Sequence, residues 1–253
     1  MSQSIWTRCE GSSRLRPLAL EPWRVVESQF ITATRKLVDS DEEQEILERL
    51  LEKAKPPLPP DPALARLHFL LFTPFRHLPL PRGSRFGTRV ERGIWYGALL
   101  LPTAFAEVAY YRLLFLHGTA ASLGTVTVEL SAFRATVRAK RAIDLTRAPF
   151  AAYVRTISSP TTYAHSQPLG AAMRESGVEA AVYVSARDRA RGKNVALFAP
   201  AFARRTPSGL STWVCSATRE RVEISKKDVF RRQRFVYPRE DFEVGGVLPA
   251  PAV

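Results

Sequence analysis

A strict alternation of apolar and polar residues over positions 125–140 constrains the fold more than any other feature of this chain. Apolar side chains occupy every second position from Val126 to Leu130, and after Ser131 the alternation resumes from Phe133 to Lys140. Successive strand residues point to opposite faces of a sheet, so the pattern predicts two half-buried antiparallel strands. The basic outer face of the second strand either contacts solvent or meets an acidic partner.

Shorter alternating or apolar runs predict further strands, and two other segments predict helices. Strands are expected at 94–96, 178–185, 195–198, 213–215, 222–224 and 235–237, and helices at 104–116 and 169–176. The run from Leu67 to Phe75 fits a buried strand or a short helix equally well. Strands outnumber helices and lack a regular βαβ rhythm, so we predict an α+β fold with a largely antiparallel core.

The first 64 residues are expected to form a separate helical extension. Ser40 and Glu43 form a capping box that predicts a helix start. The helix then carries an apolar stripe, made of Ile46, Leu47, Leu50 and Leu51. We expect this stripe to pack into the core; a docking face for a partner is the alternative. A proline-rich run at 55–62 ends the helix and forms a linker, which divides the chain into residues 1–64 and a main domain at 65–253.

The stretch from Gly93 to Leu116 is apolar enough to resemble a membrane span. Pro102, Glu107 and Arg112 interrupt it, and charges at that depth are costly in lipid. It is therefore interpreted as a strand followed by a helix that Thr103 caps, with Glu107 in the first turn. No secretory signal is visible, and the two cysteines are far apart, so we expect a cytoplasmic protein without membrane contact.

The chain is strongly basic, with 37 Lys and Arg against 24 Asp and Glu and a formal net charge of +13. Such a charge favours nucleic acid, an acidic protein or an anionic small molecule as partner. The basic residues are dispersed from Arg8 to Arg239, which weakens the case for nucleic acid. No Walker loop, GxGxxG, GxSxG or HExxH motif occurs, and the four histidines share no ligand spacing, so no metal site is predicted.

Four blocks of residues carry the chemistry instead. They are Gly83-Ser-Arg-Phe-Gly87, Gly93-Ile-Trp-Tyr96, Thr103-Ala-Phe-Ala-Glu107 and Tyr183-Val-Ser-Ala-Arg187. In order and spacing these blocks resemble the RES domain, a family of bacterial toxins that degrade NAD. His165-Ser-Gln167 resembles a further element of the family, and the resemblance covers about residues 65–200.

The resemblance implies a fold similar to the ADP-ribosyltransferases, with a split antiparallel sheet, surrounding helices and NAD in the cleft. It implies catalytic roles for Arg85, Tyr96, Glu107 and Ser185. Glu107 would stabilise the positive charge that develops when the nicotinamide–ribose bond breaks. Arg85 would bind phosphate, Tyr96 would stack on nicotinamide, and Ser185 would donate to phosphate or ribose.

Arg187 and Gln167 complete the expected NAD-binding set. NAD is then the substrate rather than a prosthetic group, and water or inorganic phosphate is the nucleophile, which makes the enzyme an NAD glycohydrolase or an NAD phosphorylase. The family also implies a cognate helical antitoxin of the Xre or DUF2384 kind, an oligomer with that antitoxin, and contact with nucleic acid only through it. Two alternatives stay open: transfer of ADP-ribose to a protein target, and a non-enzymatic nucleic-acid-binding protein.

Overall fold

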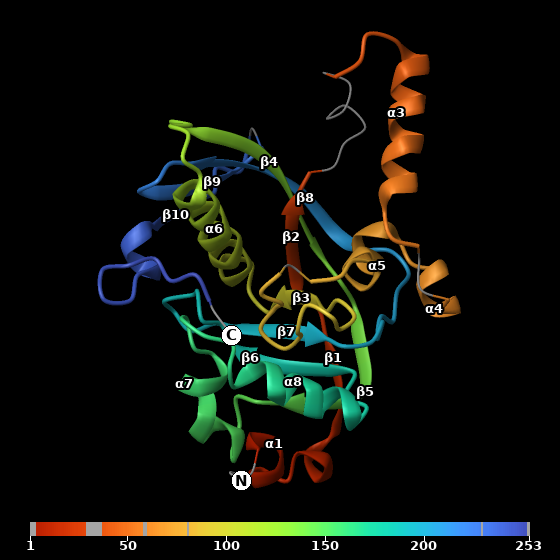
Figure 1. Ribbon diagram of the computed structural model, residues 1–253, viewed down its shortest axis with the longest axis vertical. Coiled ribbons are helices and arrows are strands. Elements are labelled where there is room, and N and C mark those ends of the chain that lie inside the picture. Colours follow the sequence, from red (N-terminus) through yellow and green to blue (C-terminus); the bar gives the residue numbers. More distant parts are fainter. Residues whose placement is uncertain (1–3, 29–36, 58–59, 80, 229, 252–253) are drawn as a thin grey trace.

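A single ten-stranded sheet organises the protein (Figure 1). The computed structural model describes residues 4–28, 37–57, 60–79, 81–228 and 230–251. The strands lie in the order β1-β5-β6-β7-β3-β2-β4-β8-β9-β10. Their bounds are Arg16–Leu20 (β1), Trp23–Glu27 (β2), Trp95–Ala98 (β3), Val126–Arg134 (β4), Val137–Asp144 (β5), Ala180–Val184 (β6), Lys193–Leu197 (β7), Ser208–Ala217 (β8), Arg221–Lys226 (β9) and Arg234–Pro238 (β10).

Helices surround the sheet, and the predicted α+β class is confirmed. The α-helices are Ile5–Arg8 (α1), Asp41–Ala54 (α3), Pro62–Ala65 (α4), Phe69–Arg76 (α5), Leu101–Gly118 (α6), Val154–Ile157 (α7) and Ser166–Glu175 (α8). Short 3-10 turns occupy Gly11–Arg14, Phe150–Tyr153 and Arg239–Phe242. The ambiguous run at 67–75 is thus mainly helical, in α5, although Pro74 lies inside it.

The sheet nearly divides between β2 and β3. These strands share one register pair, Trp23 with Ala98. On one side of this junction lie β1, β5, β6, β7 and β3, and on the other lie β2, β4, β8, β9 and β10. All strand pairs are antiparallel except β5 with β6, where 142–144 runs parallel to 180–182. A largely antiparallel sheet that opens at one junction agrees with the expected fold.

The two strands predicted over 125–140 are present, but their break and their pairing differ from expectation. β4 continues through Ser131 to Arg134, and the chain turns at 135–136 instead. Ser131 stays in the strand, where it pairs with Val26 of β2 and Thr212 of β8, and its hydroxyl shares a 2.9 Å hydrogen bond with the Ser28 hydroxyl. β4 pairs with β2 and β8, whereas β5 pairs with β1 and β6, so the two strands belong to opposite halves of the sheet.

Helix α6 begins earlier than predicted. Leu100 is its N-cap and makes no side-chain capping bond, while Pro102 occupies the first turn. Thr103 is therefore not the cap; its hydroxyl donates to Asp188 Oδ2 at 2.7 Å. Glu107 consequently lies in the second turn, beyond the strongest effect of the helix dipole. None of the helices within the described residues is long and apolar enough to cross a membrane.

The expected separation of residues 1–64 as a helical extension is wrong for the first part of that segment. β1 pairs with β5, and β2 pairs with both β3 and β4, so residues 16–27 are built into the sheet. A strand placed between two others is held by hydrogen bonds on both edges and cannot be a detachable appendage. The expectation failed because this five-residue strand is too short to give a clear alternation.

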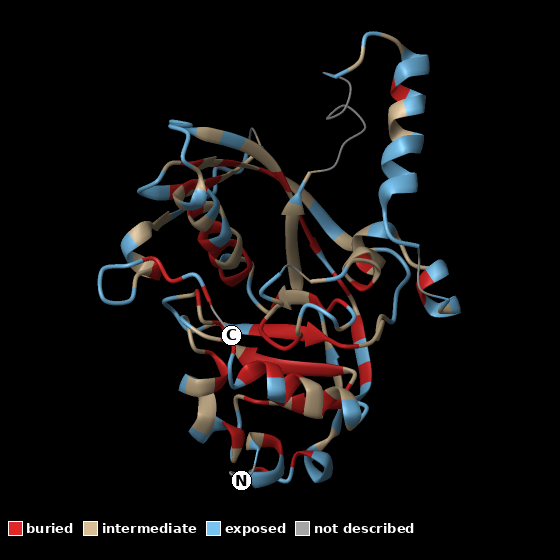
Figure 2. Cartoon of the chain, in the orientation of Figure 1, coloured by how far each residue is buried: buried red, intermediate tan, exposed pale blue. Residues whose placement is uncertain are grey.

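Helix α3 confirms the predicted capping box and contradicts the predicted packing. The Ser40 hydroxyl accepts a hydrogen bond from Glu43 N, and the helix ends at Ala54 before the prolines. Its apolar stripe, however, faces outward: Ile46, Leu50 and Leu51 are 48%, 57% and 44% exposed. Figure 2 shows this helix projecting from the body with mostly exposed residues. Packing of the stripe into the core is therefore not observed.

Candidate active site

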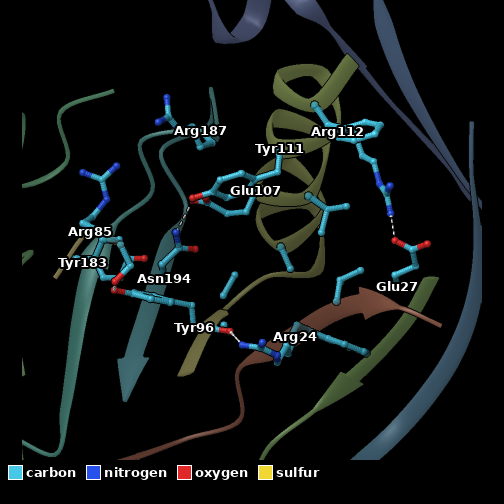
Figure 3. Close-up of a pocket in the computed structure, with 18 of the residues that line it drawn as sticks. Arg24, Glu27, Arg85, Tyr96, Glu107, Tyr111, Arg112, Tyr183, Arg187 and Asn194 are labelled. Carbon is cyan, nitrogen blue, oxygen red and sulfur yellow. Dashed lines mark hydrogen bonds and ion pairs between the residues drawn. The ribbon is translucent and has the colours of Figure 1, made fainter. Parts of the chain in front are cut away.

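A cavity of about 530 Å³ opens where the sheet divides. Strands β2 and β3 and helix α6 contribute its walls, together with the loop before β3 and the end of β6 (Figure 3). Four of the six predicted site residues line it, namely Arg85, Tyr96, Glu107 and Arg187. Ser185 and Gln167 do not line the cavity. A volume of this size is typical of sites for small molecules and nucleotides.

Glu107 reaches into the cavity from α6 and is held by two short hydrogen bonds. Ser185 Oγ and Asn194 Nδ2 both donate to Glu107 Oε1, each at 2.6 Å. Because both donors meet the same oxygen, the carboxylate is fixed in orientation while Oε2 stays available to a ligand.

The Ser185 hydroxyl is used within the protein rather than in the cavity. Its hydrogen goes to Glu107, and its oxygen accepts from the backbone N–H groups of Arg187 and Asp188, both at 3.0 Å. Asp188 in turn accepts from Thr103 of α6 at 2.7 Å. The turn after β6 is thereby tied to α6 at two points. The Ser185 hydroxyl thus donates to Glu107, and its expected donation to phosphate or ribose stays a prediction.

Arg187 is a buried cation without an acidic partner among the described residues. It is 4% exposed, and its Nη1 and Nη2 atoms find no hydrogen-bond acceptor among the described residues. Its guanidinium lies 3.5 Å from the centre of the Tyr110 ring, an attractive cation–π contact. Several N–H donors thus remain unsatisfied beside the cavity. Such a group is costly to bury, and an anionic ligand would satisfy it.

Arg85 lies in a loop whose conformation is fixed by hydrogen bonds to residues from other parts of the chain. Its Nη1 donates to the carbonyls of Ile157 and Ser159 at 2.9 and 3.1 Å, so part of its fork already has partners. Gln167 Nε2 donates to three carbonyls of the same loop, those of residues 82, 84 and 87. Gln167 is therefore a positioning residue for the Arg85 loop, and the expected direct contact with NAD is not supported.

The loop that carries Arg85 requires glycine at position 83. Its φ of +72° is a conformation that other residues rarely adopt, and an added Cβ would lie 2.4 Å from Gly87 O. A side chain at this position would therefore displace the turn that carries Arg85.

Tyr96 lines the cavity, and its hydroxyl is bound to the loop that precedes β3. The hydroxyl shares a 3.0 Å hydrogen bond with Ser84 and accepts from Phe86 N at 3.2 Å. Burial raises the pKa of Tyr96 to about 12. Tyr183 contacts it edge-on, with ring centres 6.5 Å apart and planes at 82°. Both phenols are neutral at physiological pH, since burial also raises the pKa of Tyr183 well above its ordinary value.

Two further polar residues of the cavity were missed by sequence reasoning. Asn194 on β7 is buried; its Nδ2 holds Glu107, and its Oδ1 has no partner within the described chain. A polar residue directly before the apolar run 195–197 is the signal that could have revealed it. Arg24 on β2 donates to Tyr96 O at 2.7 Å, and burial lowers its pKa to about 10. It gave no signal, because its short strand has no clear alternation.

The arrangement suits a phosphorylated substrate that carries a reacting centre. A fixed carboxylate can stabilise developing positive charge, and the arginines beside it can bind anionic groups. Figure 3 shows Arg85 and Arg187 on one side of Glu107 and the Arg112–Glu27 ion pair on the other. No three His, Cys, Asp or Glu side chains of the described residues are grouped so as to hold a metal ion.

Fold and cavity together define an α+β protein with an enzyme-type cleft at the opening of its sheet. A family model for the RES domain matches residues 63–216, so this chain belongs to the RES-domain family, as its sequence motifs predicted. The family is associated with toxins and with enzymatic activity related to NAD. No curated protein matches the chain in sequence.

Proposed function

We propose that this protein degrades NAD by cleaving the bond between nicotinamide and ribose. The observation that carries the proposal is the Glu107 carboxylate, fixed through one oxygen and placed in a cavity with the unpaired cation Arg187. Cleavage generates oxocarbenium-like positive charge at the anomeric carbon. A preoriented carboxylate stabilises that charge without having to reorganise during the reaction.

The arginines would bind the diphosphate that joins the two halves of NAD. Arg187 supplies unsatisfied N–H donors, and Arg85 keeps part of its planar fork free of the two carbonyls that it contacts. Arginine suits this role because its charge is permanent and its donors match phosphate oxygens in pairs. Tyr96 and Tyr183 offer aromatic surface next to Glu107 for the nicotinamide ring.

Release of nicotinamide from NAD by the purified protein tests the proposal. Chromatography would follow NAD loss with and without inorganic phosphate, because water yields ADP-ribose and phosphate yields its phosphorylated form. Glu107→Gln should lower the rate by about 10²- to 10³-fold, the effect typical of losing one transition-state electrostatic contact. Intact NAD at high protein concentration would overturn the proposal. Label attached to protein instead of free product would point to ADP-ribose transfer.

We further propose that the protein acts as the toxin of a type II toxin–antitoxin pair. Depletion of NAD stops growth, so a cell that makes such an enzyme needs an antitoxin, which the family implies to be a helical protein of the Xre kind. The charge of +13 favours an acidic antitoxin surface. Induced expression of the chain alone should arrest growth and lower cellular NAD, and Glu107→Gln should do neither. Growth arrest by both forms at equal expression would argue against a toxic NAD-degrading activity.

A further inference from the structure

Helix α6 has a second apolar face that the core covers only in part. One face packs against β8 and β9 in a buried cluster. The other lines the cavity and includes Val108, Tyr111 and Phe115 at successive helical spacings. Tyr111 is 49% exposed and Phe115 is 56% exposed. A helix that packs through one face normally carries polar residues on the other, so this apolar face needs a ligand or partner to explain it.

Strand β2 supplies the opposite side of the same space. Trp23, Val25 and Glu27 alternate along the strand and therefore share the face that looks toward α6. The Arg134 guanidinium covers one side of the Trp23 ring, at 4.6 Å from its centre. Glu27 pairs with Arg112 of α6 at 2.5 Å and joins the two elements. We call the five apolar residues that line this space, Trp23, Val25, Val108, Tyr111 and Phe115, the α6–β2 wall.

We infer that the α6–β2 wall binds a planar heteroaromatic ring. The inference rests on the proposed function, because NAD carries two such rings, nicotinamide and adenine. Aromatic side chains that are half exposed inside a cavity favour flat ligands, which stack without losing solvation of polar atoms. The wall is apolar, whereas the other end of the cavity holds Arg85 and Arg187. One molecule with a charged diphosphate and a flat ring would satisfy both ends.

Two of the wall residues come from outside the segment that the family model covers. The match begins at residue 63, whereas Trp23 and Val25 belong to β2. The N-terminal strand therefore adds two residues to the cavity from outside the matched segment. Its insertion between β3 and β4 places that surface beside the reacting centre.

Binding of two ring compounds that cannot be cleaved tests the inference. Nicotinamide and AMP each contain one ring of NAD and lack the nicotinamide–ribose bond. Isothermal titration calorimetry on the full chain would compare the wild type with Phe115→Ala, Tyr111→Ala and Tyr111→Phe. Phe230→Ala is the matched control, because Phe230 is 95% exposed and does not line the cavity.

We expect Phe115→Ala and Tyr111→Ala to weaken binding of one of the two probes by about tenfold, the usual effect of losing one stacking contact. Tyr111→Phe and Phe230→Ala should leave that affinity unchanged. The probe that responds identifies which ring the wall holds. Unchanged affinity for both probes in the two alanine variants would overturn the inference, as would retention of NAD-cleavage KM in both.

A folding defect would not mimic the expected result. Phe115→Leu keeps an apolar side chain and removes the flat ring, so it should lose the same affinity while its far-ultraviolet circular dichroism stays that of the wild type. Failure of the proposed function gives a different outcome. In that case the wild type would leave NAD intact, whether or not the wall variants lose affinity for a ring. Cleavage of NAD with unchanged ring binding would overturn the wall alone.

Discussion

Glu107 is positioned by side chains from two other parts of the fold, the turn after β6 and strand β7. Ser185 follows β6, Asn194 lies on β7, and Asp188 ties the turn after β6 to Thr103 of α6. The carboxylate is thus positioned by contacts that a ligand does not have to make. Preorganisation of this kind lowers the reorganisation that the transition state requires.

Replacement of Ser185 should separate its positioning role from substrate binding. In Ser185→Ala the carboxylate loses one of two short hydrogen bonds, and the N–H groups of residues 187 and 188 lose their acceptor. We expect kcat for NAD cleavage to fall by about 10- to 100-fold, as for small displacements of catalytic groups. KM should change little, because Ser185 does not line the cavity. A variant with normal kcat and raised KM would place the hydroxyl on the substrate instead.

Arg187→Met should raise the stability of the protein and weaken its binding of NAD. A buried unpaired cation costs several kcal/mol, which exceeds the roughly 2 kcal/mol of a desolvated cation–π contact with Tyr110. The variant is therefore expected to gain about 1 kcal/mol, a rise in Tm of about 2–4 °C, while KM for NAD increases. Arg189→Met is the control, since Arg189 is exposed and pairs with Asp241 at the surface. A drop in Tm for Arg187→Met would show that its burial is not costly.

The raised pKa of Tyr96 predicts how stability depends on alkaline pH. The folded protein holds this proton up to about pH 12, whereas the unfolded chain releases it near its ordinary value of about 10. The stabilising contribution is thus complete below pH 10 and is lost as the pH rises toward 12. Urea unfolding at several pH values should show that the stability gap between wild type and Tyr96→Phe narrows over this window. A constant gap would contradict the assignment.

At the scale of elements, β2 and α6 contribute more to the site than their sequence patterns predict. Both gave weak or misleading signals: β2 is too short to show its alternation, and α6 is apolar enough to resemble a membrane span. Each of them has one face toward the core and one toward the cavity. Local pattern reports that a face is apolar, but it does not report whether protein or ligand will cover it.

Helices α3 and α6 should respond very differently to loss of a leucine. Leu50 on α3 is 57% exposed, whereas Leu113 on α6 is fully buried. Leu113→Ala should therefore cost about 2–5 kcal/mol of unfolding free energy, and Leu50→Ala less than about 0.5 kcal/mol. Chemical denaturation of the two variants would measure this. A large loss for Leu50→Ala would mean that the stripe of α3 is covered in solution, for example by a second molecule.

At the scale of the whole molecule, the sequence predicted the class of fold and four of the cavity residues. Strand alternation and ordered motif blocks are local signals, and they were sufficient for Arg85, Tyr96, Glu107 and Arg187. The features that the sequence did not predict depend on distant contacts. The hydroxyl of Ser185 turns to Glu107, 78 residues away, and β2 inserts between strands that follow it by more than 60 residues. No periodicity encodes such pairings.

The near-division of the sheet gives a ligand a mechanical role. β2 and β3 share one register pair, and beyond it the hydrogen bonds between the two strands are missing. The cavity lies at this place. A molecule that contacts Tyr96 on one side and Trp23 on the other would replace these missing contacts and connect the two halves of the sheet. Substrate would then also stabilise the folded protein, because a molecule that binds only the folded state raises its stability.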